Sequence, residues 1–174
     1  RALEGLRCFD TTAITQEDLS RQTMVLDERT RENHKSQVGS LTDWLNSLEL
    51  TVTVEALDKN NLKRATQLLN KTNQGNMRTR RLTESELTEW VHNEGFACWV
   101  FGVRDRFGDS GLTGLMSLVK KDDKAEVIDF VVSCRVFNRG VEQAMLHKAC
   151  SHCADFDISE LSATFVPTKK NNPC

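Results

Sequence analysis

The sequence predicts an α/β fold: a mixed β-sheet flanked by helices and preceded by a long polar N-terminal helix. Three observations support this fold class. Segments with apolar residues at every second position alternate with segments of helical periodicity. Three strand-like segments follow one another between residues 97 and 134 with only short turns between them, which predicts an antiparallel meander. A helical segment then leads to a final strand, and a strand–helix–strand connection of that kind makes its two strands parallel.

The N-terminal helix is predicted over residues 15–39, which are charged nearly all round. Thr15 and Asp18, three residues apart, form a helix-start signal. A helix this polar buries little and commonly bridges two bodies, although an exposed arm has the same composition. Its large apolar residues are Leu19, Met24, Val25, Leu26 and Val38.

A second, short helix is predicted from Ser40 to Leu48, with Ser40 and Asp43 as its cap. Beyond it the charge-rich pattern ends and strand-like alternation begins. We therefore divide the chain into an interdomain linker and helical arm, residues 1–48, and an α/β domain, residues 49–174.

The α/β domain opens with a strand over residues 50–57, where β-branched residues alternate with period two. Asp58 is predicted to cap a helix over residues 59–69. Helical spacing directs four of its apolar residues inward, namely Leu62, Ala65, Leu68 and Leu69. After a loop rich in amide side chains, Thr83 and Glu86 form a capping box that begins the next helix.

Residues 97–105 and 112–120 are predicted as the first two strands of the meander, with "RFGDSG" as the turn between them. A charged turn precedes the third and more buried strand, residues 125–134. A helix over residues 140–156 and a strand over residues 160–167 complete the pattern.

Composition and charge argue against several classes of function. The net charge of −2 disfavours a general nucleic-acid binder, because affinity for a phosphate backbone needs a net basic surface. No apolar run approaches the ~20 residues that cross a bilayer, so no membrane partner is expected. The six cysteines lack the density and regularity of a secreted disulfide scaffold, which favours a cytoplasmic protein.

The segment "RVFNRG", residues 135–140, lies between the third meander strand and the following helix. It is similar to the Arg/Gln-x-x-Gly-x-Gly/Ala turn that cradles phosphate in the Gcn5-related N-acetyltransferase (GNAT) fold, except that Asn138 replaces the first Gly. The mixed strand order is also the one expected of that fold. Backbone N–H groups at a helix N-terminus favour an anion, and Asn tolerates the left-handed conformation. The predicted cofactor-binding residues, for coenzyme A or a phosphopantetheine arm, are Arg135, Asn138, Arg139 and Gly140.

Five separated segments, in the right order, resemble the FkbH-like proteins. The resemblance covers the interdomain segment and most of the GNAT-like half. FkbH-like proteins pair an N-terminal HAD-superfamily phosphatase domain with a C-terminal GNAT-like domain. The segments are "RCFDTTAIT" (7–15), "QLLNKTNQGNMRTRRLTE" (67–84), "RDRFGDSGLTGL" (104–115), "SCRVFNRGVE" (133–142) and "VPTKKNNP" (166–173).

This resemblance implies a function and a set of partners. FkbH-like proteins load a glyceryl unit from a bisphosphoglycerate onto an acyl carrier protein, a step in the biosynthesis of methoxymalonyl-type polyketide extender units. The implied partners are an acyl carrier protein and the protein's own N-terminal phosphatase domain. Magnesium is implied only in that phosphatase domain, so no metal site is expected in these residues. The chain is also expected to stop short of the last strands of a GNAT sheet.

Three departures from the FkbH-like pattern are visible. Gly75 stands where a bulky residue, commonly Phe, is usual, and Asn138 stands where Gly is usual. No phosphatase domain is present in these 174 residues, although "DFDIS", with Asp155 and Asp157, imitates its D-x-D-x-Ser/Thr signature. These two residues are predicted to end a helix instead of following a strand, so we interpret them as a solvated turn.

The loop "NKTNQGNMRTRR", residues 70–81, combines amides with guanidinium groups. Such groups suit an anionic or amide-bearing ligand, and a phosphopantetheine arm carries both features. Equally, the amides of an irregular loop bond to its own backbone. For Arg78, Arg80 and Arg81 a solvated or partner-facing surface is favoured. The predicted substrate-binding residues of the loop are Asn70, Lys71, Thr72, Asn73 and Gln74.

Two further segments carry candidate site residues. Asp105, Arg106 and Asp109 are predicted to bind substrate, although a tight hairpin turn also requires Asp and Gly, and that alternative is favoured. Cys134 precedes Arg135 near a helix N-terminus, a position that lowers a thiol pKa, so it is a candidate catalytic residue for a thioester relay. A small buried side chain is the favoured alternative for this cysteine.

Three functions from different classes remain open. The chain is the GNAT-like half of an FkbH-like glyceryl-loading enzyme, a stand-alone acyl-CoA-dependent N-acyltransferase, or a noncatalytic module that docks the carrier protein or its own phosphatase domain. The five resembling segments favour the first over the second. The sequence does not separate the first from the third.

Overall fold

The computed structural model describes the backbone of residues 16–171 and the side chains of residues 23–171. The predicted helix-start signal of Thr15 and Asp18 lies outside the described side chains. None of the helices in this part of the chain combines the length and the apolar character that a membrane span requires.

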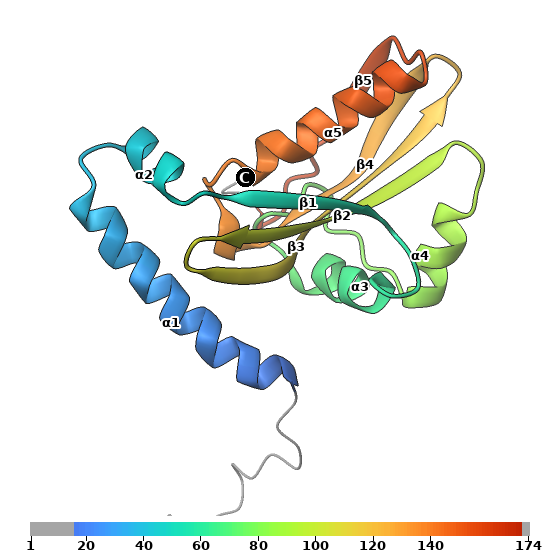
Figure 1. The fold of residues 1–174 in the computed structure, drawn as a ribbon. Helices are drawn as coiled ribbons and strands as arrows, with labels where there is room; N and C mark the ends of the chain where they lie inside the picture. Colours follow the sequence, from blue (N-terminus) through green and yellow to red (C-terminus); the bar gives the residue numbers. More distant parts are fainter. Residues whose placement is uncertain (1–15, 172–174) are drawn as a thin grey trace, which may run out of the picture.

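The N-terminal arm consists of the two predicted helices, α1 (Gln16–Gln37) and α2 (Leu41–Ser47). The cap of α2 is confirmed, because the hydroxyl of Ser40 accepts a hydrogen bond from the backbone N–H of Asp43 at 3.1 Å. In Figure 1 α1 lies at one end of the sheet, beside the hairpin that joins β2 and β3. The helix α1 therefore packs against the end of the sheet where this hairpin lies (Figure 1).

A five-stranded mixed sheet forms the centre of the domain, in the order β1-β2-β3-β4-β5. The first four strands are antiparallel neighbours, and β5 pairs with β4 in parallel, as the sequence predicts. The strands are β1 (Thr51–Ala56), β2 (Phe96–Asp105), β3 (Gly108–Lys121), β4 (Lys124–Val132) and β5 (Glu160–Ala163).

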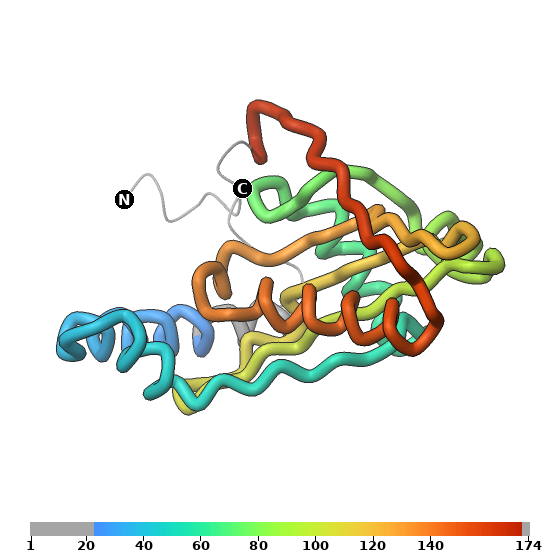
Figure 2. The backbone as a smooth tube through the Cα atoms, turned by 90° about the horizontal axis from the view of Figure 1, so that it is seen from above, coloured from blue at the N-terminus to red at the C-terminus, as the bar shows by residue number. Residues whose placement is uncertain are grey.

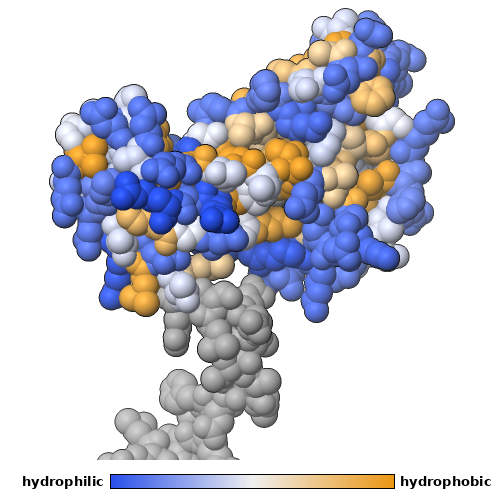
Figure 3. All heavy atoms as spheres, viewed as in Figure 1, coloured by the Kyte–Doolittle hydropathy of each residue, from blue (hydrophilic) through white to orange (hydrophobic). Residues whose placement is uncertain are grey.

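Helices cover both faces of this sheet (Figure 1). On one face lie α3 (Leu62–Lys71) and α4 (Glu84–Val91), and on the other lies α5 (Val141–Asp155). The predicted capping box of α4 is present, formed by Thr83 and Glu86. Figure 3 shows mainly polar atoms over α3 and α4, as expected when a helix buries one stripe against a sheet, whereas apolar and polar atoms are mixed along α5.

Two apolar cores result, one on each face. Because successive side chains of a strand point to opposite faces, Trp99 and Phe101 of β2 pack toward α5, and Cys98 and Val100 pack toward α3 and α4. All four are nearly inaccessible to solvent, with exposures from 0% to 8%. Burial on both faces explains why this strand is apolar at consecutive positions instead of alternating.

The predicted cap of α3 is wrong. The N-cap residue is Asn61, and the helix begins at Leu62, three residues later than predicted. The Asp58 carboxylate instead accepts the backbone N–H groups of Asn60 and Asn61, at 2.8 and 3.0 Å. These bonds lower the pKa of Asp58. They also stabilise a turn, so the helix begins only after Asn61.

The predicted six-residue turn between β2 and β3 is also wrong. Only Arg106 and Phe107 form the turn, and β3 begins at Gly108. The reversal is tight because the carboxylate of Asp105 accepts the N–H groups of Phe107 and Gly108, at 3.0 and 3.1 Å. Within the longer strand the pairing with β2 shifts register between Val103 and Arg104, and Gly111, the partner of Val103, has φ of 65°.

One buried carboxylate connects the central strands to the α3–α4 loop. Asp129 of β4 is fully buried, and it accepts two hydrogen bonds from the guanidinium of Arg80, at 2.9 and 2.5 Å. The hydroxyl of Ser117 donates a third at 2.5 Å. The register of β3 and β4 shifts beside this pair, between Ser117 and Leu118. The Asp129 charge is thus buried with three hydrogen-bond donors bound to it.

We predict that Asp129→Ala lowers the free energy of unfolding by about 2–3 kcal/mol, because Arg80 and Ser117 lose their shared acceptor. This loss in the free energy of unfolding is small for a broken buried ion pair, because the Arg80 side chain is 26% exposed and can reach water. Urea denaturation followed by circular dichroism measures it. Glu55→Ala, at an exposed position of β1, is the control; an equal loss in both variants would contradict the prediction.

Candidate functional site

The turn between β4 and α5 has the backbone conformation that the sequence predicts. After β4 the chain makes a short 3-10 helix, η2 (Cys134–Val136), and Asn138 then adopts φ of 60°. Gly140, with φ of 85°, is the N-cap residue of α5. Two left-handed residues therefore bring the chain directly onto the N-terminus of a 15-residue helix. That end of a helix is favourable for an anion.

A ring of four charged side chains joins this turn to α1. Glu28 of α1 accepts hydrogen bonds from Arg139 at 2.8 and 2.9 Å and from Arg31 at 2.6 Å. Arg31 in turn donates to both oxygens of Asp105, at 2.5 and 3.0 Å. Asp105 lies 3.8 Å from Arg139 and completes the ring. We call Glu28, Arg31, Asp105 and Arg139 the ion-pair ring.

The ion-pair ring is mostly buried, which makes its pairing obligatory. The side chains of Arg31, Asp105 and Arg139 are 4%, 1% and 6% exposed, and only Glu28 reaches solvent, at 42%. Burial opposes the charge of Arg31, but hydrogen bonds and attraction from Asp105 and Glu28 outweigh it and raise its pKa. Each charge therefore depends on its neighbours in the ring.

Two of the predicted site residues, Arg139 and Asp105, bind to other members of the ion-pair ring. Arg139, a predicted cofactor ligand, directs its guanidinium at α1. Asp105, a predicted substrate ligand, holds the hairpin and Arg31, in line with the turn alternative. Arg106 lies outside the ring: it donates to the carbonyl of Ser47 at 3.3 Å.

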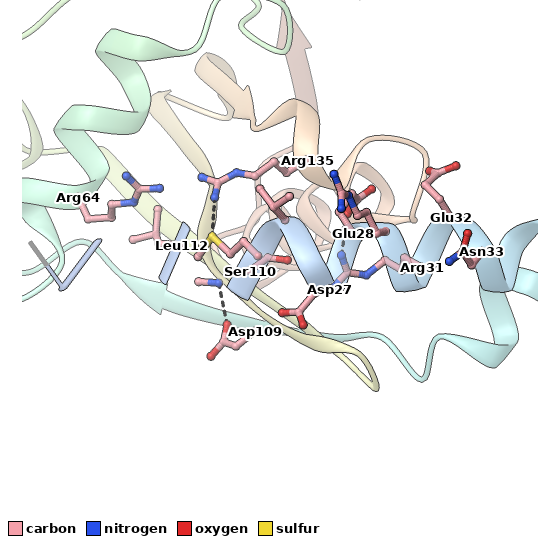
Figure 4. A pocket seen from close by; sticks show the side chains of 14 residues that line it. Asp27, Glu28, Arg31, Glu32, Asn33, Arg64, Asp109, Ser110, Leu112 and Arg135 are labelled. Carbon is pink, nitrogen blue, oxygen red and sulfur yellow. Dashed lines mark hydrogen bonds and ion pairs between the residues drawn. The ribbon is translucent and has the colours of Figure 1, made fainter. Parts of the chain in front are cut away.

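A cleft of about 980 Å³ opens between α1 and the domain. Figure 4 shows side chains of α1, α3, the start of β3 and the β4–α5 turn around it. Arg64 and Arg135 face it from the domain, and Asp109 lines its floor, where its carboxylate accepts the N–H of Gly111 at 2.7 Å. Arg135 also lies 2.9 Å from the sulfur of Met24. The cleft thus places basic and acidic groups directly beside the turn.

The amides of the α3–α4 loop bond to the loop itself. Asn70 forms two hydrogen bonds with the backbone of Leu82, at 2.7 and 3.1 Å. The carbonyl oxygen of the Asn73 side chain accepts from Arg81 at 2.6 Å. These are the bonds that the loop-tying alternative predicts. Lys71 ends α3, Thr72 is its C-cap, and Gln74 is exposed.

The most deeply buried amide of this loop is not among the predicted substrate-binding residues. Asn76 is 1% exposed. Its NH₂ group donates to the carbonyls of Leu69 and Thr72, at 3.3 and 3.2 Å, and its oxygen accepts the N–H groups of Arg78 and Thr79. Its place after Gly75 in a run of regularly spaced Asn residues was the available signal.

Residues Gly75–Met77, which we call the edge segment, pair with the outer edge of β4. The N–H of Met77 donates to the carbonyl of Phe130 at 3.1 Å, and the N–H of Val132 donates to the carbonyl of Gly75 at 2.7 Å. On its other side the edge segment contacts the chain that follows β5: the N–H of Val166 donates to the backbone carbonyl of Met77 at 3.0 Å. Figure 2 shows these chain segments running beside one another.

The preference for a solvated or partner-facing surface is wrong for Arg78 and Arg80, which are engaged within the molecule, whereas Arg81 is exposed. Arg78 binds Glu126 and the carbonyl of Thr164, and Arg80 binds Asp129. Arg81 donates to the carbonyl of Leu69 at 2.7 Å as well as to Asn73. The guanidinium groups of Arg78 and Arg80 reach the two carboxylates of β4, while Arg81 supplies a donor to a loop carbonyl from the surface.

Cys134, the candidate nucleophile, is exposed at the start of η2, so the buried alternative for this residue is wrong. By contrast, Cys98 is buried, and burial together with the charge of Asp129 raises the pKa of its thiol. No cluster of three or more potential metal ligands occurs among the described residues.

Comparison with known proteins identifies the fold. No family model matches the chain, and no curated protein matches it by sequence. The structure is similar to a ribosomal-protein-alanine N-acetyltransferase from Brucella melitensis biovar Abortus, with 13% identity, a TM-score of 0.54, and coverage of 68% of this chain and 83% of that one. It is also similar to a GNAT family acetyltransferase from Staphylococcus aureus, with 9% identity, a TM-score of 0.50, and coverage of 70% and 90%.

A further likeness covers less of the related chain. The match to an IAA acetyltransferase from Bacillus cereus has 16% identity and a TM-score of 0.44, and it covers 65% of each chain. Together with the mixed five-stranded sheet, the likenesses with higher TM-scores show that the chain has a GNAT-like fold. The predicted fold class is confirmed.

We predict that Asp105→Asn lowers the free energy of unfolding by about 3 kcal/mol, because it leaves the charges of Arg31 and Arg139 buried against Glu28 alone. The amide keeps an oxygen for the turn N–H groups, but it removes the negative charge and one of the two acceptors that Arg31 uses. Chemical denaturation measures it. The control, Asp109→Asn, makes the same change at an exposed position of the same hairpin and is expected to cost less than about 0.5 kcal/mol. Equal losses would contradict the proposed dependence on the ring.

Proposed function

We propose that this domain binds a pantetheine thioester, carried by coenzyme A or by an acyl carrier protein, and takes part in acyl transfer. The observation that carries the proposal is the β4–α5 turn. It combines two left-handed residues, Asn138 and Gly140, with a helix N-terminus and the exposed Arg135. A phosphate is the ligand that such a turn suits best. The GNAT-like fold supports the same class of function.

The residues present fit the phosphate of such a cofactor but not the amides of its pantetheine arm. The phosphate of the cofactor would bind at the turn, with Arg135 as its charged donor. The amides of a pantetheine arm would need free backbone groups along β4, but the edge segment pairs with Phe130 and Val132 there. When bound, the cofactor supplies the activated thioester; the chain supplies the anion site and the cleft beside α1.

Cys134 is the residue of this region with nucleophilic chemistry. Its thiolate would attack the thioester carbonyl, form an acyl-cysteine and release the pantetheine thiol, which takes up the proton that Cys134 loses. The exposed position beside Arg135 supports this role. Asp109, Arg64 and Arg135 line the cleft in which a polar acyl group or its acceptor would lie.

The finer proposal follows from the five segments that resemble FkbH-like proteins. In it, the domain receives the carrier protein while an N-terminal phosphatase domain, with its magnesium, loads a glyceryl unit from a bisphosphoglycerate. The helix α1, which the ion-pair ring attaches to the turn, would connect the two domains. The protein would act in the cytoplasm, in the formation of methoxymalonyl-type extender units.

A noncatalytic docking module is the second candidate. Two observations favour it: the edge segment already pairs with β4, and Arg139 is engaged with Glu28. In this alternative the carrier protein is recognised by its folded surface, and its pantetheine arm contributes nothing to affinity.

We predict that Arg135→Ala weakens the binding of coenzyme A by about tenfold, or ~1.4 kcal/mol, because a charge-assisted contact to phosphate is lost. Isothermal calorimetry measures the affinity. Arg104→Ala removes an exposed arginine of β2 with the same net charge change and is expected to leave the affinity within about twofold. Unchanged affinity in folded Arg135→Ala would remove the turn from the proposed site.

We also predict that a carrier protein bearing its phosphopantetheine arm binds this chain at least about tenfold more tightly than the same carrier without the arm. The arm adds a phosphate and two amides to the contact, whereas the folded carrier surface is identical in the two forms. Native mass spectrometry or calorimetry compares them. Equal affinities would establish the docking module and exclude pantetheine recognition.

A further inference from the structure

We infer that the edge segment, Gly75–Met77, closes the strand edge along which a pantetheine arm would lie, so that the arm binds β4 only after this segment withdraws. The inference rests on the proposed function for its ligand. The closed edge itself rests on backbone hydrogen bonds in the structure. Binding of the arm and seating of the edge segment are thus mutually exclusive.

The outer edge of β4 has two halves with different partners. Along Lys124–Val127 it pairs with β5. Beyond Val127 the strand β5 is no longer paired, and the edge from Phe130 to Val132 pairs with the edge segment instead. Without that segment, one carbonyl and one N–H would lack these partners. An extended chain that carries amides is the kind of ligand that adds to such an edge.

The position of this edge points to a pantetheine arm. Val132 ends β4, and the phosphate-binding turn begins at Arg135, three residues later. A ligand with its phosphate at the turn therefore has its amide-bearing arm beside Val132 and Phe130. The same N–H of Val132 and carbonyl of Phe130 bond to Gly75 and Met77 in this structure. A backbone N–H makes one good hydrogen bond, so the two partners compete.

The edge segment lies against β4 in a close backbone contact that leaves no room for a side chain at Gly75. An added Cβ at Gly75 would lie 2.1 Å from the carbonyl oxygen of Val132 and 2.6 Å from the ring of Phe137. Any other residue at position 75 therefore forces the segment away from β4. The FkbH-like proteins that this chain resembles usually carry a bulky residue here, so the tight seating depends on a residue that departs from their pattern.

Anchors on both sides hold the segment in place. The side chain of Asn171 donates to the backbone carbonyl of Asn76 at 2.9 Å. Arg78 and Arg80 bind Glu126 and Asp129 on β4 itself. When the binding-competent state is a fraction of the population, the apparent dissociation constant equals the intrinsic one divided by that fraction. Loosening the segment should therefore strengthen arm binding.

The experiment compares Gly75→Ala with Gly39→Ala in the 174-residue chain. An added Cβ at Gly39 meets no atom within 4 Å, so this control makes the same substitution without a clash. Hydrogen exchange of the Val132 and Met77 amides reports the seating of the segment without any ligand. Calorimetry with coenzyme A reports the affinity. Asn171→Ala, which removes an anchor instead of adding a clash, is the second variant in case Gly75→Ala does not fold.

We expect faster exchange at both amides and an affinity for coenzyme A about tenfold higher in the loosened variants, with Gly39→Ala unchanged. Faster exchange with unchanged or weaker affinity would overturn the inference while the proposed function stands. No binding of coenzyme A by the unmodified chain or by any variant would overturn the proposed function, and the inference with it.

Discussion

The backbone hydrogen bonds of β4 are the constraint on which the candidate site depends. β4 lies between β3 and β5, so the backbone N–H and C=O groups on both of its sides need hydrogen-bond partners. The strand β3 satisfies one edge, but β5 satisfies only the first half of the other. The edge segment satisfies the second half. The position of the α3–α4 loop, the path of the chain after β5 and the access of any ligand to the turn all follow from that requirement.

Buried carboxylates attach the outlying segments to this sheet. Asp129 binds Arg80 of the α3–α4 loop, and Asp105 binds Arg31 of α1. In both pairs the carboxylate belongs to the sheet and the guanidinium reaches it from outside. Arginine suits this arrangement, because its fork donates two parallel hydrogen bonds to one carboxylate. The pairs set position more than they add stability, because desolvation offsets much of their attraction.

Two contacts near these attachments bear on the chemistry of the β4–α5 turn. Glu28 draws Arg139 toward α1, and the edge segment occupies the strand that leads into the turn. The turn itself has the backbone that an anion needs, through Asn138 and Gly140. Under the proposed function, a ligand with its phosphate at the turn and its arm along β4 would therefore require a movement of the α3–α4 loop.

The sequence by itself determined the features that depend on neighbouring residues: the order of strands and helices, the capping box of Thr83 and Glu86, and the left-handed Asn138. Each follows from local periodicity or local backbone preference. Only the tertiary structure decided the contacts between residues far apart in the chain. Glu28 and Arg139 are 111 residues apart, and the close approach of Gly75 to Val132 appears only when the loop lies on β4. The sequence does not show which residue a given charge or glycine will contact. Those contacts depend on which strand edges and which buried charges of the folded sheet still need a hydrogen-bond partner.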